Sequence, residues 1–234
     1  MDGRISVKSL WDDATGFLLA NREVALAIGL TFFFLPTLIG GMFLPEPAMD
    51  HVDWGAMLPV MIMVALIQTF GQLSLLALYL DPARPTVGEA MRTAIGLYPS
   101  AVLLALLVGL VVGAGFVLLI LPGVYLAARL FPAIALLVAE RRSIGDTLSR
   151  AWAITRGAAW QILLFLVLWA LALIFCQVLA QITIGSIGLL IGKLIGAETL
   201  GRIIGEVAVA LVGMVFSLGI VTASGAACRR LSGL

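Results

Sequence analysis

Long uncharged stretches dominate the pattern of the chain and predict six membrane-crossing helices. A helix that crosses about 30 Å of hydrocarbon needs about 20 apolar residues. Dividing the uncharged runs by that length predicts helices at about 24–45, 54–80, 99–120, 122–140, 158–182 and 203–227. Pro36 is expected to kink the first helix, and Pro122-Gly123 to form a tight turn between the third and the fourth. The apolar residues between 183 and Gly196 are too few for another crossing, so we expect a re-entrant or surface-lying segment there.

A second pattern repeats three times, before the first, third and fifth of these helices. Each copy begins with a [ST]-x-x-[DE] capping-box motif, at Ser9–Asp12, Thr86–Glu89 and Ser143–Asp146. Apolar residues then follow at i, i+4, i+7 and i+8, which is one face of an α-helix. They are Leu10, Ala14, Phe17 and Leu18, then Val87, Met91, Ala94 and Ile95, then Ile144, Leu148, Ala151 and Trp152.

The repeated pattern predicts that each unit is a short amphipathic helix followed by a transmembrane hairpin. The units are about 9–80, 86–140 and 143–229, within a single integral membrane domain that covers 1–234. The fold class is therefore an all-α polytopic bundle of six helices in three hairpins. One interpretation places the amphipathic helices at the cytoplasmic interface, with the apolar face in lipid and the basic face toward headgroups. The other is that they form a docking platform for a partner or sense lipid composition.

Composition supports the membrane assignment and excludes several classes of protein. Of the 234 residues, 62% are hydrophobic and 12% are charged, against about 45–50% and about 25% in ordinary soluble domains. This balance excludes nucleic-acid-binding proteins, soluble enzymes and disulfide-stapled secreted modules. The two cysteines, Cys176 and Cys228, lie in apolar stretches and indicate neither a disulfide framework nor a zinc site.

The distribution of basic residues predicts the orientation of the helices. Of the 14 Lys and Arg residues, two, Lys193 and Arg202, fall on the side opposite to the termini. Eleven fall on the side of the termini: Arg4, Lys8, Arg22, Arg84, Arg92, Arg141, Arg142, Arg150, Arg156, Arg229 and Arg230. The positive-inside rule therefore predicts that both termini are cytoplasmic. The first 23 residues mix acids and bases and have no A-x-A site after them, so we expect mature protein rather than a cleavable signal peptide.

Arg129 is the most informative charged residue, because it lies within a predicted span. It follows Pro122 by seven residues, which places it about 10 Å from the non-cytoplasmic end of its helix. A buried arginine costs several kcal/mol and normally faces a partner or water. Glu206 enters its own helix from the same side and is the natural counter-ion. Three alternatives stay open: an Arg129–Glu206 structural pair, a site for a lipid phosphate or anionic substrate with Tyr125 beside it, or snorkelling to the interface.

Two further groups of residues predict contacts inside the bundle. Gln68 and Gln72, and likewise Gln177 and Gln181, form i, i+4 pairs on the second and fifth helices. Such amides bridge helices in lipid, although they could also line a wet cavity. A stripe of small residues allows helices to approach closely and is the expected oligomer contact; it consists of Gly188, Gly192 and Gly196.

No catalytic or metal-binding motif is present in the sequence. It contains no H-E-x-x-H, no G-x-S-x-G, no P-loop and no cysteine–histidine dyad. His51, with Asp50 and Asp53, could form a weak cation site, but a solvated loop is the favoured interpretation. We therefore expect no enzyme activity, no metal and no cofactor.

The run Leu121-Pro122-Gly123-Val124-Tyr125-Leu126-Ala127-Ala128-Arg129-Leu130-Phe131-Pro132 resembles a bacterial inner-membrane family. The same resemblance extends to Glu140, the stretch 148–157 and Trp160. The family includes the membrane domain fused to some glycerophosphodiester phosphodiesterases, and related stand-alone six-helix proteins. The resemblance implies a bacterial inner membrane and a role beside lipid metabolism or envelope maintenance. It does not imply phosphodiesterase activity, since in the fused members the chemistry belongs to a separate soluble domain.

These observations predict a non-catalytic, multi-pass protein of the bacterial inner membrane. Its expected partners are membrane lipids or an envelope or lipid-metabolism protein, with no nucleic acid, and it could form a homo-oligomer. The alternative is a small transporter or permease for an amphiphile or an anion. A transporter would need a polar cavity on which the glutamine pairs and Arg129 converge.

Overall fold

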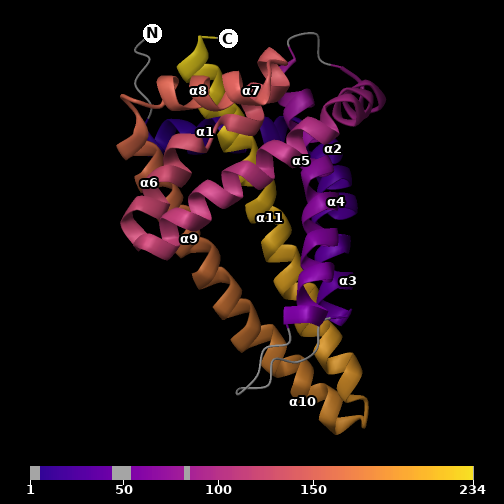
Figure 1. Ribbon diagram of the computed structural model, residues 1–234. Coiled ribbons are helices and arrows are strands. Elements are labelled where there is room, and N and C mark those ends of the chain that lie inside the picture. The colour runs from indigo at the N-terminus through magenta and orange to yellow at the C-terminus, as the bar shows by residue number, and fades with distance from the viewer. Residues whose placement is uncertain (1–5, 44–53, 82–84, 234) are drawn as a thin grey trace. The chain divides into compact units, whose positions relative to one another are not determined.

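The protein is an all-α, multi-pass membrane protein (Figure 1). The computed structural model describes residues 6–43, 54–81 and 85–233, and no strand occurs among them. Within this part of the chain, six helices are long and apolar enough to cross a membrane: Arg22–Met42, Met57–Leu80, Val87–Leu118, Ile120–Glu140, Ala159–Leu194 and Thr199–Ser232. The predicted fold class is confirmed.

The elements follow one another in the order α1 (Val7–Ala20), α2 (Arg22–Gly29), the π-helix η1 (Leu30–Phe34), α3 (Leu35–Phe43), α4 (Trp54–Leu80), α5 (Val87–Leu118), α6 (Ile120–Leu130), α7 (Ala133–Glu140), α8 (Ile144–Ile154), α9 (Ala159–Ala180), the π-helix η2 (Gln181–Gly185), α10 (Ser186–Leu194) and α11 (Glu198–Ser232). The first span therefore joins α2, η1 and α3. Its π-helical turn ends two residues before Pro36, which lacks the N–H that a regular helix would use.

The helices form two compact units that interleave along the chain. Unit 1 comprises Met1–Ala25, Gln72–Ala170 and Leu218–Leu234, and unit 2 comprises Leu26–Gly71 and Leu171–Ser217. Unit 2 contains two Lys or Arg residues, Lys193 and Arg202, and all the other basic residues belong to unit 1. Unit 1 thus contains the basic segments that the sequence predicts on one side of the membrane.

The three capping motifs have different outcomes. Thr86 and Glu89 form the predicted capping box at the start of α5, with both reciprocal hydrogen bonds present. Ser143 caps α8, because its Oγ accepts the Asp146 N–H at 3.2 Å, but the predicted box is incomplete: the Asp146 carboxylate accepts the Ser143 hydroxyl at 2.6 Å rather than the backbone N–H. The predicted box at Ser9 is wrong: α1 begins one turn earlier, and Ser6 is its N-cap. Ser6 and Ser9 each accept the other's backbone N–H, at 3.1 and 3.0 Å, so a serine in place of the acid completes the box.

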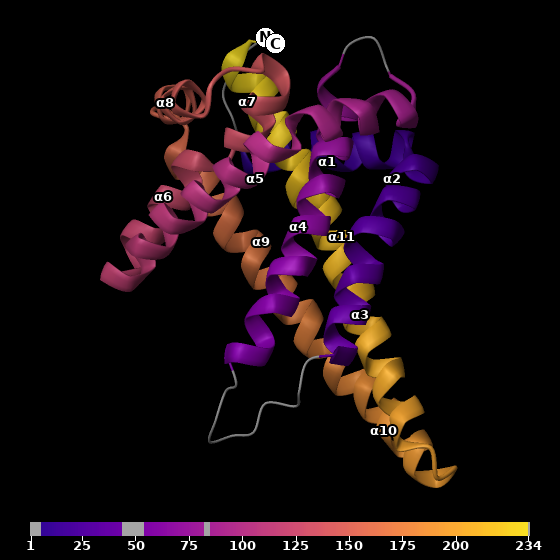
Figure 2. The same ribbon diagram turned by 45° about the vertical axis from the view of Figure 1, so that its right-hand side comes forward.

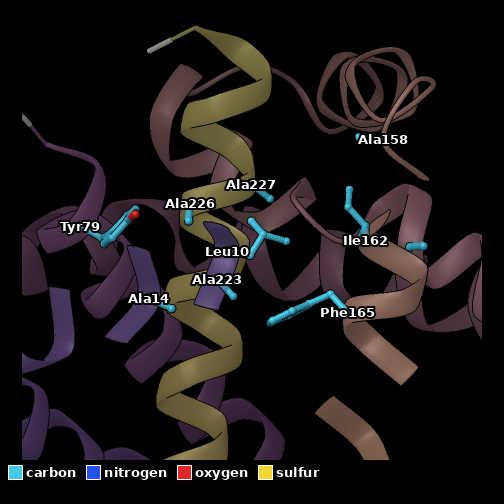
Figure 3. Close-up of a cluster of buried hydrophobic side chains, with 10 residues drawn as sticks. Leu10, Ala14, Tyr79, Ala158, Ile162, Phe165, Ala223, Ala226 and Ala227 are labelled. Atoms are coloured by element: carbon cyan, nitrogen blue, oxygen red, sulfur yellow. The ribbon is translucent and has the colours of Figure 1, made fainter. Parts of the chain in front are cut away.

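The apolar face of α1 packs on protein rather than on lipid (Figure 3). Leu10 and Ala14, which the repeat pattern places on that face, are 0% and 2% exposed. They belong to a buried cluster with residues from α4, α6, α9, α11 and the turn before α9: Tyr79, Ala128, Ala158, Ile162, Phe165, Ala223, Ala226 and Ala227. The interpretation that the apolar face of α1 lies in lipid is therefore wrong.

The second repeat has no separate amphipathic helix. One continuous helix, α5, runs from Val87 to Leu118. In the first repeat Asn21 ends α1, and in the third Thr155 ends α8. Between Ala94 and Pro99 the sequence has no Ser, Thr, Asn or Asp that could cap a new helix, so the cap segment and the span stay joined.

The predicted turn at Pro122-Gly123 lies three residues too late. The chain turns at Leu119, whose extended backbone (φ −165°, ψ 151°) ends α5 and starts α6. Pro122 falls in the first turn of α6, where the missing N–H of proline costs no helical bond. Gly123 packs closely against α5, because a Cβ there would lie 2.6 Å from Cγ of Phe116. Gly123 therefore allows α5 and α6 to pack closely in their hairpin.

The predicted re-entrant segment after the fifth helix is also wrong. The chain from Ala159 to Leu194 is one continuous 36-residue helix, and α11 starts at Glu198 after a short turn. Gly196, at φ +69°, forms this turn. The Ala197 N–H bonds to Gly192 O at 2.7 Å and the Gly196 N–H to Lys193 O at 3.4 Å, the pattern of a Schellman motif.

The glycine stripe is used within the chain. Gly188 packs against Gly201 of α11, where a Cβ on Gly188 would lie 2.5 Å from Gly201 O. Gly192 is buried one turn further along α10. Gly188 and Gly192 therefore lie in the α10–α11 hairpin rather than on a free face, and the predicted oligomer stays a prediction.

An ion pair joins α1 to the end of α11 inside unit 1. Arg230 donates from Nε to Asp13 Oδ2 at 2.6 Å and from Nη2 to Asp13 Oδ1 at 3.0 Å. Each side chain is about one third exposed. We expect a double-mutant cycle with Asp13→Asn and Arg230→Gln to give a coupling free energy of about 0.5–1 kcal/mol in unfolding experiments. A coupling near zero in low salt would contradict this bidentate contact.

Candidate functional site

Arg129 is a buried and unpaired cation at the end of α6. The residue is 2% exposed, and its Nε has no hydrogen-bond partner. Helix α6 ends one residue later because Pro132 follows, and a proline cannot supply the next helical N–H. Among the residues that the structure describes, no carboxylate forms an ion pair with Arg129.

Two aromatic rings face the guanidinium. The Arg129 Cζ atom lies 4.2 Å from the ring centroid of Trp152 and 5.9 Å from that of Tyr125. The two rings are nearly perpendicular, at 88°, with their centroids 6.3 Å apart. Tyr125 comes from the preceding turn of α6, and Trp152 comes from α8, which lies next to α6 and α7 (Figure 2). This cation–π contact attaches Arg129 to an amphipathic helix.

Thr155 makes a second connection between the same two segments. Its buried hydroxyl lies 3.0 Å from Arg129 O and 2.7 Å from Ala151 O, within hydrogen-bonding distance of both. The last carbonyls of a helix have no intrahelical N–H partner. Thr155, which ends α8, thus satisfies one of the free carbonyls at the end of α6. The backbone of Arg129 is fixed even though its side chain has no acceptor.

The energetics of this arrangement favour an additional partner for Arg129. Removing a charged side chain from water costs several kcal/mol, whereas a cation–π contact returns about 0.5–2 kcal/mol. A guanidinium has five N–H donors and no acceptor. The described residues therefore leave N–H donors of the Arg129 guanidinium without an acceptor, and an anion could accept hydrogen bonds from them.

The predicted counter-ion of Arg129 belongs to the other unit. Glu206 lies on α11 in unit 2, where a Cβ on Gly41 would be 2.8 Å from its Oε2, so the carboxylate rests against a glycine of α3. Arg129 lies in unit 1. The Arg129–Glu206 pair stays a prediction.

Three of the four predicted glutamines, Gln68, Gln177 and Gln181, belong to unit 2, and Gln72 belongs to unit 1. Gln68 donates from Nε2 to Thr37 Oγ1 of α3 at 3.0 Å, and Gln177 donates to Val209 O of α11 at 3.5 Å. The Gln181 side chain lies beside Gly205, with Oε1 3.9 Å from the position of a Cβ there. Gln72 is half-buried in α4. The hydrogen bonds of Gln68 and Gln177 connect helices, as expected for bridging amides in lipid.

The structure gives no support for a metal centre in the part of the chain that it describes. No group of three or more His, Cys, Asp or Glu side chains is close enough there to hold a metal ion. The weak cation site considered at Asp50, His51 and Asp53 lies outside the described residues.

Sequence reasoning missed Trp152 and Thr155 as partners of Arg129. The sequence does contain a signal for Trp152, because the third copy of the repeat has an aromatic residue at the i+8 position. The first two copies have the aliphatic residues Leu18 and Ile95 there. Thr155 gave no signal, since a threonine at the end of a predicted helix is common.

Comparison with protein-family models, with curated proteins and with solved structures finds no match to this chain. The resemblance of residues 121–160 to the membrane domain of glycerophosphodiester phosphodiesterases therefore stays a prediction.

Proposed function

We propose that this membrane protein is a non-catalytic, lipid-interacting accessory protein of the bacterial inner membrane, with both termini in the cytoplasm. The observation that carries the proposal is the buried, unpaired guanidinium of Arg129 between the rings of Tyr125 and Trp152. Its anionic partner is the phosphate of a membrane lipid. The concentration of basic residues in unit 1 supports this assignment, because anionic headgroups attract such a surface.

The two rings give the site the character of a membrane interface. Tyr125 is 42% exposed and Trp152 is 39% exposed, so both rings contact the surroundings of the protein while Arg129 lies behind them. Tyrosine and tryptophan side chains are favoured at the level of lipid headgroups. A lipid phosphate that approached the guanidinium beside these rings would meet its free donors, and the acyl chains of the lipid would lie against apolar residues.

The transporter alternative has no comparable observation. Its polar cavity would need the glutamines to face a shared space, whereas Gln68 and Gln177 bind neighbouring helices inside unit 2. An enzyme would need an acid, base or nucleophile constellation, and the Arg129 site combines an arginine with aromatic rings and one threonine. We therefore retain the lipid-binding function.

Native mass spectrometry tests the proposal directly. The protein is purified in a mild detergent, supplied with equal amounts of phosphatidylglycerol and phosphatidylcholine, and compared with Arg129→Ala and Arg129→Lys. We expect the wild type to retain one more phosphatidylglycerol than Arg129→Ala does. Arg129→Lys keeps the charge but loses the bidentate geometry, so its retention should be intermediate. Arg156→Ala is the matched control, since it removes an exposed arginine just after α8.

Circular dichroism of each variant separates binding from folding. If Arg129→Ala stays helical and retains the wild-type number of anionic lipids, the proposal is wrong. If Arg129→Ala does not fold, Arg129→Lys decides: unchanged lipid retention in a folded Arg129→Lys protein supports a purely structural role for the positive charge. Equal losses in Arg156→Ala and Arg129→Ala would assign the effect to net charge and also contradict a specific site.

A further inference from the structure

A second basic site lies elsewhere in unit 1, where the first turns of α5 meet the end of α7. An open surface cavity of about 430 Å³ is present there, and Arg92, Thr93, Gly96, Leu97 and Arg141 line it. Arg92, Gly96 and Arg141 are exposed, and Thr93 and Leu97 are half-buried. Pockets that bind small molecules have volumes of about 300–1,000 Å³. The cavity is therefore large enough for a phosphate group with part of the molecule that carries it.

Neither arginine of this cavity is held by a short polar contact, although the charge of Arg92 acts on the nearby Glu89 carboxylate. Among the described residues, neither Arg92 nor Arg141 has a side-chain hydrogen bond or an ion pair. Nearby arginines differ, since Arg142 and Arg150 pair with Glu140 at 2.8 and 3.4 Å. The acid one turn before Arg92 is also occupied: the Glu89 carboxylate accepts the N–H and the hydroxyl of Thr86.

Arg141 stands at a backbone position that favours glycine. It ends α7 at φ 50° and ψ 39°, in the left-handed region. It is the one non-glycine residue with positive φ in the described part of the chain. Helices commonly end with a glycine in this conformation, because a side chain is disfavoured there. The arginine side chain at this position lines the cavity.

We infer that this cavity binds a phosphate group. Two guanidinium groups provide forked N–H donors that match phosphate oxygens, and Thr93 adds a hydroxyl. Gly96 leaves the wall open, since a Cβ there would meet no atom within 4 Å. The phosphate comes either from a lipid headgroup or from a soluble phosphate ester. The inference does not depend on the Arg129 site, which shares no residue with this one.

Three variants alter the cavity in different ways. Arg92→Gln and Arg141→Gly each remove one guanidinium, and Arg141→Gly also relieves the left-handed conformation, so this variant should melt at a higher temperature than the wild type. Gly96→Leu leaves both charges in place and fills the cavity. Gly109→Leu is its matched control on the same helix, since a Cβ on Gly109 also meets no atom within 4 Å and Gly109 does not line the cavity. Arg156→Gln controls for the loss of one positive charge.

Calorimetric titration of the full chain in a neutral detergent tests the inference with two probes. One is inorganic phosphate, and the other is short-chain phosphatidic acid added to the micelles. We expect wild-type protein to bind at least one probe, and each of the three cavity variants to bind at least about tenfold more weakly. Gly109→Leu and Arg156→Gln should keep wild-type affinity for both probes, and Arg129→Ala should keep wild-type affinity for inorganic phosphate.

The two probes identify the source of the phosphate. Binding of both supports a soluble phosphate ester, and binding of phosphatidic acid alone supports a lipid headgroup. If wild-type protein binds neither, the inference is overturned. It is overturned as well if Arg141→Gly and Gly96→Leu, folded and at least as stable as the wild type, bind as tightly as Gly109→Leu. Loss of binding in Arg129→Ala alone would assign the bound phosphate to the other site.

Discussion

Replacing Leu10 by alanine is expected to lower the free energy of unfolding by about 2–5 kcal/mol. Leu10 is 0% exposed and lies in the cluster that joins α1 to α4, α9 and α11. Truncation removes buried apolar contacts and leaves a cavity that helices fixed at several points cannot fill. Unfolding in a denaturing detergent, followed by circular dichroism, measures the change.

Leu19 of the same helix provides the matched control. Leu19 is 74% exposed, so Leu19→Ala should change the free energy of unfolding by less than about 0.5 kcal/mol. The pair of variants tests which surface covers the apolar face of α1. Equal and small losses would mean that lipid or detergent, rather than protein, lies against Leu10.

The sequence predicts which face of α1 is apolar, but it does not predict what covers that face. Leu10 and Ala14 recur at offsets shared by all three copies, and they are the residues that the structure buries. Lipid tails are as apolar as leucine side chains, however. An apolar stripe on a membrane protein is therefore compatible with contact to lipid or to protein, and the small residues of α11 that receive Leu10 lie more than 200 positions away in the sequence.

Helix boundaries were predicted less well than helix existence, for a physical reason. Dividing apolar runs into lengths of about 20 residues assumes that each helix ends at the hydrocarbon boundary. The helix from Ala159 to Leu194 has 36 residues, or about 54 Å at 1.5 Å per residue. It continues until Gly196, where a residue with positive φ can end it. Local capping, rather than bilayer thickness, sets this boundary.

The candidate site could be predicted in part. Arg129 and Tyr125 lie one turn apart on one helix, so their proximity follows from the sequence. Trp152 reaches the same guanidinium from 23 positions further along the chain. Its approach depends on the break at Phe131-Pro132 and on the left-handed turn at Arg141, which together place α8 beside α6. Neither geometry can be calculated from hydrophobic periodicity.

Replacing Gly201 by alanine should destabilise the α10–α11 hairpin of unit 2 by about 1–3 kcal/mol, and leucine at this position should cost more. A Cβ on Gly201 would collide with the carbonyl group of Gly188, and a Cβ on Gly188 would lie 2.5 Å from Gly201 O. Both obstacles are backbone atoms, which cannot rotate away as a flexible side chain can. The two helices must separate to admit even one methyl group, and they then lose the close packing that small residues allow.

Gly109→Ala is the control that isolates this steric effect. Gly109 lies inside α5, and a Cβ there meets no atom within 4 Å. Alanine is favoured over glycine within a helix by up to about 1 kcal/mol, so Gly109→Ala should be neutral or stabilising. The same substitution should therefore change the unfolding midpoint in opposite directions at the two positions. A stabilising effect of Gly201→Ala would show that the backbones of α10 and α11 are not in contact, and would leave the glycine stripe free to bind another copy of the chain.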